Sequence, residues 1–203
     1  MRRPIRVVVV DDHTGVRKAL GRVLEGLPEF SVVSMLADDQ RLSSVLTRDA
    51  PDVVVLDHDL VQTDGLSLCL RMKRRHDCPP VVIYSGYAAP VLVLAATVAQ
   101  ADAVVHKAGP VEVLLDTLRR LAEGRRLLPA PAPDLVAAAA ARLHAADLPV
   151  MAQLLDGARP AQAAHALAIT EDEVMLRANR IVDVLQARRD VHARTAVRLE
   201  ALP

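Results

Sequence analysis

The sequence predicts an α/β fold, a doubly wound sheet of five parallel strands, followed by an all-helical unit. Three observations support this prediction. Short valine-rich runs alternate with segments of helical pattern five times in the first 124 residues. These runs are continuously apolar rather than alternating, as strands buried on both faces require. A segment rich in proline and alanine then leads into sequence of purely helical character.

Ten elements are expected in the first unit, taken in chain order. The strands are predicted at 7–10, 30–36, 53–56, 81–84 and 103–106. The helices are predicted at 15–27, 38–49, 67–76, 90–100 and 111–123. Because strands and helices alternate, the strands should be parallel, with helices on both faces of the sheet. Function in such sheets collects at the carboxyl ends of the strands.

The segment 125–133 is predicted to be an extended linker. Pro129, Pro131 and Pro133 alternate with alanine there, and proline interrupts helices and central strands. The linker divides the chain into units at 1–124 and 134–203. In the second unit, helices are expected at 135–146, 150–155, 161–167, 171–185 and 193–199, with Asp134 as the cap of the first.

Composition and charge restrict the classes of function. Lysine plus arginine equal aspartate plus glutamate at 25 each, so the whole chain carries no basic signature of nucleic-acid binding. Aromatic residues make up only 1%, which argues against binding of single-stranded nucleic acid by base stacking. No apolar stretch reaches membrane-spanning length without a charge, so we expect a soluble, cytoplasmic protein.

Five polar residues follow or end the predicted strands and should meet at one edge of the sheet. Asp11 and Asp12 follow the first strand, Asp57 the third, Ser85 the fourth and Lys107 the fifth. Three carboxylates would repel one another, so a cation is expected beside them. Oxygen ligands favour a hard divalent ion, Mg²⁺ before Ca²⁺.

This set of groups suits phosphoryl chemistry. Asp57 could attack a phosphoryl group and become an aspartyl phosphate. Mg²⁺, Ser85 and Lys107 would then neutralise the phosphoryl oxygens. The alternative for each residue alone is a turn or cap role, but five such residues at consecutive strand ends favour a common site.

These residues resemble the receiver domain of response regulators, a flavodoxin-like fold, over about residues 4–124. The match is carried by the motifs VVVVDDH ending at residue 13, VVVLD ending at Asp57, Ser85-Gly86 and His106-Lys107. The resemblance implies that Asp57 is the phosphoacceptor. It also implies that Asp12 binds Mg²⁺ directly, Asp11 through water, and Asp59 through its backbone carbonyl, and that a sensor histidine kinase is the partner.

Two positions depart from the family pattern. Val61 stands where the family usually has proline, and Val104 where it usually has an aromatic switch residue. Control by a ligand or partner instead of phosphate is therefore an alternative. A second alternative is an aspartate-nucleophile phosphatase, with Asp57 as nucleophile and Asp59 as general acid. The early position of Asp11 and Asp12 and the absence of a cap domain argue against that enzyme.

A helix-turn-helix is expected in the second unit. Two helices flank a tight turn at 168–170, and Thr170 with Glu173 forms a capping-box pattern. The unit has eight arginines against nine acids, but six arginines against only Asp183 and Asp190 lie between residues 177 and 198. This local cluster could meet phosphates, or be a solvated helix face.

The second unit resembles the LuxR-type helix-turn-helix, and the order of the two units is that of NarL/FixJ response regulators. The match covers 143–185. It implies a DNA-binding transcriptional regulator rather than an enzyme, with these candidate contact residues: Met175, Leu176, Arg177, Asn179 and Arg180. Asn179 is the candidate for an adenine contact. The family usually has a basic residue at the position of Met175.

The segment 90–100 predicts a contact surface, because it is apolar nearly all round. A helix that only covers a sheet should show a polar face. We expect this helix to pack against a second subunit or against the helix-turn-helix. Phosphorylation would shift this region and free the DNA-binding unit or favour a homodimer, which would bind double-stranded DNA at an inverted repeat.

Overall fold

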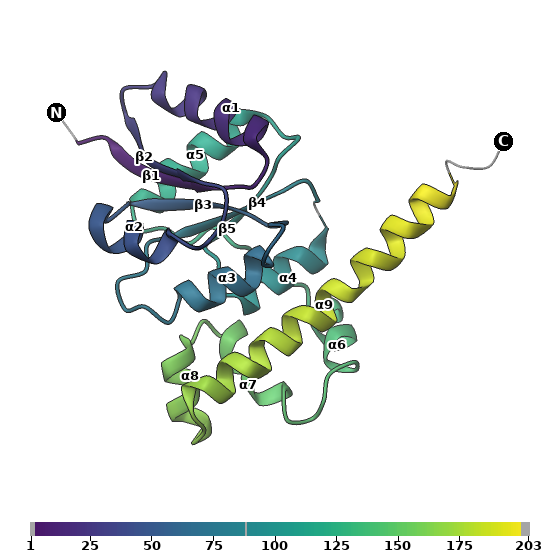
Figure 1. The fold of residues 1–203 in the computed structure, drawn as a ribbon. Helices are drawn as coiled ribbons and strands as arrows, with labels where there is room; N and C mark the ends of the chain where they lie inside the picture. The colour runs from purple at the N-terminus through teal and green to yellow at the C-terminus, as the bar shows by residue number, and fades with distance from the viewer. Residues whose placement is uncertain (1–2, 88, 200–203) are drawn as a thin grey trace.

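A five-stranded parallel sheet forms the first part of the chain (Figure 1). The computed structural model describes residues 3–87 and 89–199, with side chains described as far as residue 187. The strand order is β2-β1-β3-β4-β5, as a doubly wound sheet requires. The strands are β1 (Ile5–Val10), β2 (Phe30–Leu36), β3 (Val53–Asp57), β4 (Val81–Ser85) and β5 (Ala103–His106). The predicted fold class is confirmed.

Helices cover both faces of this sheet (Figure 1). They are α1 (Thr14–Glu25), α2 (Leu42–Asp49), α3 (Gly65–Met72), α4 (Pro90–Val98) and α5 (Val111–Ala122). Successive strand residues point to opposite faces, so Val7 and Val9 pack with α1 and α5, whereas Val8 and Val10 pack with α2, α3 and α4. The continuous valine runs are therefore explained by burial on both sides.

In the first unit, two helix starts differ from the predictions by two residues or more. Asp38 does not begin a helix, because its carboxylate accepts a hydrogen bond from the backbone N–H of Gln40 (3.0 Å) and holds a turn there. The helix α3 begins two residues earlier than predicted. Asp64 caps it by accepting a hydrogen bond from the backbone N–H of Ser67 (2.8 Å).

The second part of the chain is helical. Its elements are α6 (Pro133–Ala140), α7 (Leu148–Leu155), α8 (Pro160–Leu167) and α9 (Glu171–Leu199). Pro133 belongs to the first turn of α6 rather than to the predicted linker, because proline is favoured where no helical N–H is needed. Asp134 lies in the same first turn, and Ala132, not Asp134, occupies the cap position.

The helix α9 is one continuous element, so the prediction of separate helices at 171–185 and 193–199 was wrong. The segment between them contains neither glycine nor proline, and nothing in it breaks a helix. The predicted cap is half confirmed. The backbone N–H of Glu173 donates to Thr170 Oγ1 (3.1 Å), but the Glu173 carboxylate pairs with Arg177 (2.7 Å) instead of closing a capping box.

The apolar helix α4 packs against the second part of the chain, which confirms one of the two partners predicted for it. It contacts α6, α7 and α9, and α3 also contacts α9 (Figure 1). Leu92 and Ala95 of α4 join Ile181 and Leu185 of α9 in a single hydrophobic cluster. Among the described residues, no helix is long and apolar enough to cross a membrane.

Candidate functional site

The polar residues predicted to meet at the carboxyl edge of the sheet do end or follow four neighbouring strands. Asp57 and Ser85 are the last residues of β3 and β4. Asp11 and Lys107 are the first residues beyond β1 and β5. Asp11, Asp57 and Ser85 are each at most 1% exposed. Burial of two carboxylates at this position requires compensating positive charge.

Lys107 supplies that charge. Its Nζ lies 2.7 Å from Asp11 Oδ2 and 2.8 Å from Asp57 Oδ2. Burial alone would lower the pKa of Lys107, but the hydrogen bonds to Asp11 and Asp57 outweigh burial and raise it. Burial raises the pKa of Asp57, against the opposing effect of Lys107. The lysine therefore stays charged while the central carboxylate is held in an environment that disfavours its ionised form.

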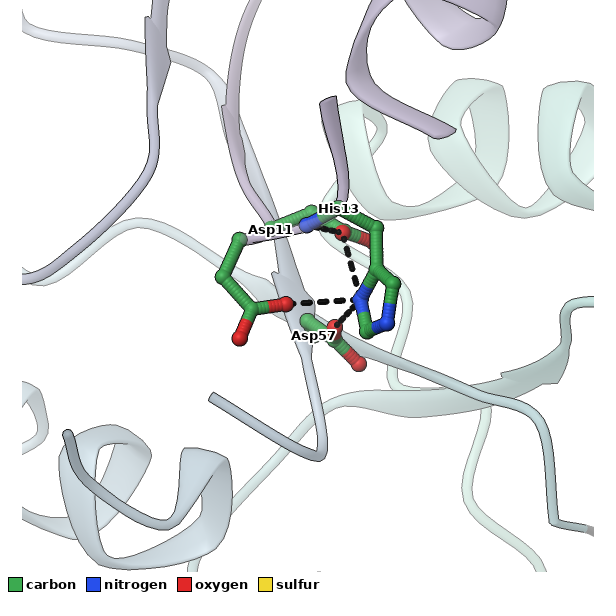
Figure 2. Close-up of side chains that lie close together, drawn as sticks. Asp11, His13 and Asp57 are labelled. Atoms are coloured by element: carbon green, nitrogen blue, oxygen red, sulfur yellow. Dashed lines mark hydrogen bonds and ion pairs between the residues drawn. The ribbon is translucent and has the colours of Figure 1, made fainter. Parts of the chain in front are cut away.

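His13 is a member of this cluster to which the sequence analysis gave no role. Its Nδ1 lies 2.6 Å from Asp12 Oδ1, 3.6 Å from Asp11 Oδ1 and 3.7 Å from Asp57 Oδ2. Figure 2 shows the imidazole beside the carboxylates of Asp11 and Asp57. Its place directly after two aspartates at a strand end was the signal that could have identified it.

The ligand atoms of the cluster fit a small divalent cation. One atom from each of Asp11, Asp12, His13 and Asp57 lies within 4.8 Å of the others. Asp12 Oδ1 and Asp57 Oδ2 are buried carboxylate oxygens, which lie 2.6 Å from His13 Nδ1 and 2.8 Å from Lys107 Nζ. Buried carboxylate oxygens of this kind are the ligands Mg²⁺ prefers. The cluster can therefore hold Mg²⁺.

The loop after β3 forms one wall of the site and leaves it open to solvent. Asp59 donates its backbone N–H to Asp57 Oδ1 (3.1 Å), and Val61 donates its backbone N–H to Asp12 Oδ2 (2.9 Å). A surface hollow of about 410 Å³ lies against Asp12, His13 and Asp59. Val61 is 87% exposed beside it. A ligand can therefore reach Asp12, His13 and Asp59 from this side.

Ser85 is oriented by a histidine that the sequence analysis also missed. Its Oγ accepts a hydrogen bond from the backbone N–H of Tyr87 (3.0 Å) and lies 3.1 Å from Nδ1 of His58. His58 is 1% exposed. The signal was the period-2 strand pattern, which places residue 58 on the same face as Leu56, where α3 and α4 cover the sheet.

An aromatic ring approaches Lys107 from β4 rather than from β5. Val104 leaves no ring on β5 at the family's usual position. The Lys107 ammonium instead lies 5.7 Å from the ring centroid of Tyr84, and the Tyr84 hydroxyl is 3.5 Å from the Lys107 carbonyl. The site therefore has an aromatic neighbour that the sequence pattern did not predict.

The residues predicted to contact DNA lie on α9, and most of them already have partners within the chain. Met175 is only 6% exposed, whereas Leu176 is 53% exposed. Arg177 pairs with Glu173 (2.7 Å), Arg180 with Asp147 (2.5 Å), and Asn179 donates to the Met175 carbonyl (2.9 Å). In this arrangement Met175 is closed to any DNA contact, because it is part of the hydrophobic cluster that α9 shares with α4.

The class of protein follows from the sheet order and from the way one lysine bridges the buried carboxylates. A buried central carboxylate paired with a lysine, together with a serine at the next strand end and an aspartate pair that could hold a cation, on a sheet of this order, is the arrangement of a receiver, the input domain of a signalling protein. Comparison with known families agrees, because the response regulator receiver domain matches residues 7–119. The chain belongs to the response regulator receiver family.

Two curated relatives show how far this similarity extends. The chain is 31% identical over 160 residues to the response regulator MprA of Mycolicibacterium vanbaalenii. This match covers 77% of this chain and 66% of that protein. It is 36% identical over 83 residues to a protein-glutamate methylesterase/protein-glutamine glutaminase of Anaeromyxobacter dehalogenans, covering 41% of this chain. The chain spans only 23% of the methylesterase, so this match is limited to the first part of the chain.

Solved structures extend the similarity to both parts. The response regulator ChrA of a heme-sensing two-component system is 27% identical, with a TM-score of 0.54, covering 93% of this chain and 99% of that one. The response regulator RcsB in a DNA complex is 20% identical, with a TM-score of 0.58, covering 90% of this chain and 92% of that one. The fold of a receiver followed by a helical unit is therefore shared over most of the chain.

Proposed function

We propose that the chain is a transcriptional regulator in which phosphorylation of Asp57 controls DNA binding by the helices after the linker. The observation that carries the proposal is the buried Asp57 carboxylate, which meets the Lys107 ammonium at 2.8 Å and lies 3.7 Å from Nδ1 of His13, a residue that lines an open hollow. We assign residues 1–124 to the receiver, 125–132 to the linker and 133–203 to the DNA-binding unit, since Pro133 already belongs to α6.

The proposed reaction is a phosphoryl transfer from a sensor histidine kinase. A carboxylate oxygen of Asp57 attacks phosphorus, and the bond between phosphorus and the donor nitrogen breaks. The donor nitrogen keeps the electron pair and takes up a proton. Lys107 and the Ser85 hydroxyl then contact the phosphoryl oxygens. Asp11, Asp12, Asp57 and the Asp59 carbonyl would hold Mg²⁺, which when bound neutralises phosphoryl charge.

The helix-turn-helix of α8 and α9 supports the DNA-binding half of the proposal. Thr170 caps α9 at the end of a tight turn, as in a recognition helix. We propose base or phosphate contacts from Met175, Leu176, Arg177, Asn179 and Arg180, to double-stranded DNA with an inverted repeat bound by a homodimer. Since Met175 is buried in the hydrophobic cluster that α9 shares with α4, we propose that α9 leaves α4 before it enters a groove. Kinase and promoter together imply action in the cytoplasm.

One alternative keeps the same fold but replaces phosphate by a ligand or partner as the signal. Val104 favours it, because the family's usual aromatic switch residue is absent there. The aspartate-nucleophile phosphatase is not proposed, because the chain belongs to the receiver family.

The test is phosphorylation of the purified chain by acetyl phosphate with Mg²⁺, read as intact mass. One phosphoryl adduct is expected on the wild type, and none on Asp57→Asn or on the wild type with EDTA. Asp116→Asn is the matched control, because Asp116 is an exposed carboxylate on α5. No adduct on the wild type would contradict phosphorylation control and favour the ligand- or partner-controlled alternative.

A further inference from the structure

His58 is a buried polar side chain for which the proposed phosphoryl transfer has no use. It follows Asp57 directly, and its side chain is 1% exposed. Its backbone N–H donates to the Tyr84 carbonyl (3.2 Å), and its carbonyl accepts from the backbone N–H of Gly65 (2.9 Å). The backbone of His58 is thus fixed between β4 and α3. A change at the site can therefore act on the ring through the groups that its side chain contacts.

One edge of the ring faces the Ser85 hydroxyl, which is proposed to contact the phosphoryl group. His58 Nδ1 lies 3.1 Å from Ser85 Oγ. Ser85 Oγ already accepts a hydrogen bond from the backbone N–H of Tyr87, so its own proton is available for donation to Nδ1. The ring then carries its proton on Nε2, which lies 3.9 Å from Asp64 Oδ1. Ser85, His58 and Asp64 thus lie in a row, which we call the polar chain, with hydrogen-bond distance at Ser85 and a longer approach of 3.9 Å at Asp64.

The other side of the ring reaches the contact between α4 and α9. His58 lines a small hollow with Val91, Leu92 and Ala95 of α4 and with Leu185 and Gln186 of α9. The polar chain also ends near α9, because Asp64 lies close enough to Asp183 to help raise the pKa of that carboxyl, after the effect of burial. A single ring therefore contacts both the phosphorylation site and the surface that buries α9.

We propose that His58 is the positioning residue that couples Ser85 to the α4–α9 contact. In the unphosphorylated chain the Ser85 hydroxyl donates to His58 and holds the ring against α4 and α9. An aspartyl phosphate at residue 57 draws that hydroxyl to a phosphoryl oxygen. Nδ1 of the ring then loses the Ser85 hydroxyl, and the packing of Leu92 and Leu185 around the ring changes.

This inference rests on the proposed phosphorylation of Asp57. It assigns to His58 the part that the family's aromatic residue would play from the position of Val104. Buried couplings of this kind change an equilibrium by about 5- to 150-fold. If His58 served only to pack, an apolar side chain of similar volume would preserve the effect of phosphorylation on α4 and α9.

The test compares wild type, His58→Leu and His58→Asn by hydrogen-exchange mass spectrometry, before and after acetyl phosphate with Mg²⁺. Intact mass measures the phosphoryl adduct in the same samples. In the wild type, phosphorylation should speed exchange in 90–98 and 171–187. In His58→Leu we expect the same adduct but at least a five-fold smaller change in exchange. His58→Asn keeps an acceptor near the position of Nδ1 and should restore most of the change.

Controls make each outcome decisive. His106→Leu is the matched variant, because the His106 ring contacts the Gly86 carbonyl (3.0 Å) and not the Ser85 hydroxyl; it should keep the wild-type change. Equal changes in His58→Leu and wild type, or equal losses in His58→Leu and His106→Leu, would overturn the coupling role. No adduct on the wild type would overturn the proposed function, and with it the coupling.

If His58→Leu does not fold, the comparison of His58→Asn with Ser85→Ala replaces it. Retained coupling in Ser85→Ala would overturn the role.

Discussion

The central carboxylate of the site, Asp57, is held in an environment that disfavours its charge. Its pKa is raised by burial and by the neighbouring Asp11, while Lys107 acts in the opposite direction. Below the unfolded pKa, such a carboxyl is protonated in both states and does not change the free energy of unfolding. As pH rises through the folded pKa, the folded chain loses stability. The ionised Asp57 site therefore costs the metal-free chain some stability at neutral pH.

The variant Asp57→Asn is expected to remove this cost. In EDTA at pH 7 it should raise the unfolding temperature, by about 2–4 °C for each kcal/mol relieved in a chain of this size. The gain should shrink as pH falls toward about 4, where the unfolded carboxyl is itself protonated. Differential scanning calorimetry across pH measures both effects. An Asp57→Asn chain less stable than wild type at pH 7 would contradict the argument.

The positions of the site residues could be predicted where strand ends decide them, and not where side-chain neighbours do. Asp11, Asp57, Ser85 and Lys107 were predicted to meet, because parallel strands bring their carboxyl ends to one edge. His13 and His58 were missed, because their roles depend on which groups their rings face. Ser85 is 27 residues away from His58 in the chain, and no local pattern connects the two.

At the scale of elements, short apolar runs and breakers explain which boundaries could be predicted. The strands β2 and β5 have the predicted ends, since valine runs between turn residues define them. The predicted end of a helix at Leu185 was wrong, because no breaker follows it. The helix α6 ends at Ala140, well before the predicted 146, although alanines favour helix there. Tertiary packing decides such ends.

The turn of the helix-turn-helix contains a residue in an unfavourable conformation. Ala168 closes α8 with a φ of 54°, in the left-handed region, where a Cβ costs about 1–2 kcal/mol. Ala168→Gly should therefore stabilise the chain by about 1 kcal/mol. Urea unfolding followed by circular dichroism measures this change.

The matched control for this turn lies two residues before the cap. Ala166 is an exposed residue inside α8, and Ala166→Gly should destabilise the chain by about 1 kcal/mol. The two substitutions are identical in chemistry and opposite in expected sign. Two destabilised variants would show that the turn at residue 168 is not strained as argued.

At the scale of the whole molecule, the two parts share one hydrophobic interior. A single cluster contains Leu56 of the sheet, Leu92 of α4, and Ile181 and Leu185 of α9. Arg74, beyond the end of α3, also pairs with Glu171 (3.2 Å) and Asp172 (3.0 Å) at the start of α9. These exposed ion pairs add little, so apolar burial is the main term holding α9 against the sheet unit.

The composition of the chain provides a direct measurement of this coupling. Its two tyrosines, Tyr84 and Tyr87, both lie in the first part, and it has no tryptophan. Tyrosine fluorescence therefore reports the sheet unit, while far-ultraviolet circular dichroism reports helices of both parts. If the shared cluster makes the parts one cooperative unit, the two probes should give the same urea midpoint in the unphosphorylated chain.

Leu185→Ala tests this cooperativity from the side of α9. Leu185 is 2% exposed, and its truncation should destabilise by about 2–5 kcal/mol. In a cooperative unit the loss moves the tyrosine transition as well, although the change lies about 100 residues from either tyrosine in the chain. Leu176→Ala, at a position 53% exposed, is the matched control and should change stability by less than about 0.5 kcal/mol.

A tyrosine transition that stays at its wild-type midpoint in Leu185→Ala, while the helical signal shifts, would mean that the two parts unfold independently. The cluster would then be too weak to withhold α9 from the proposed DNA contact, and the proposed control of DNA binding would have to act through dimerisation instead.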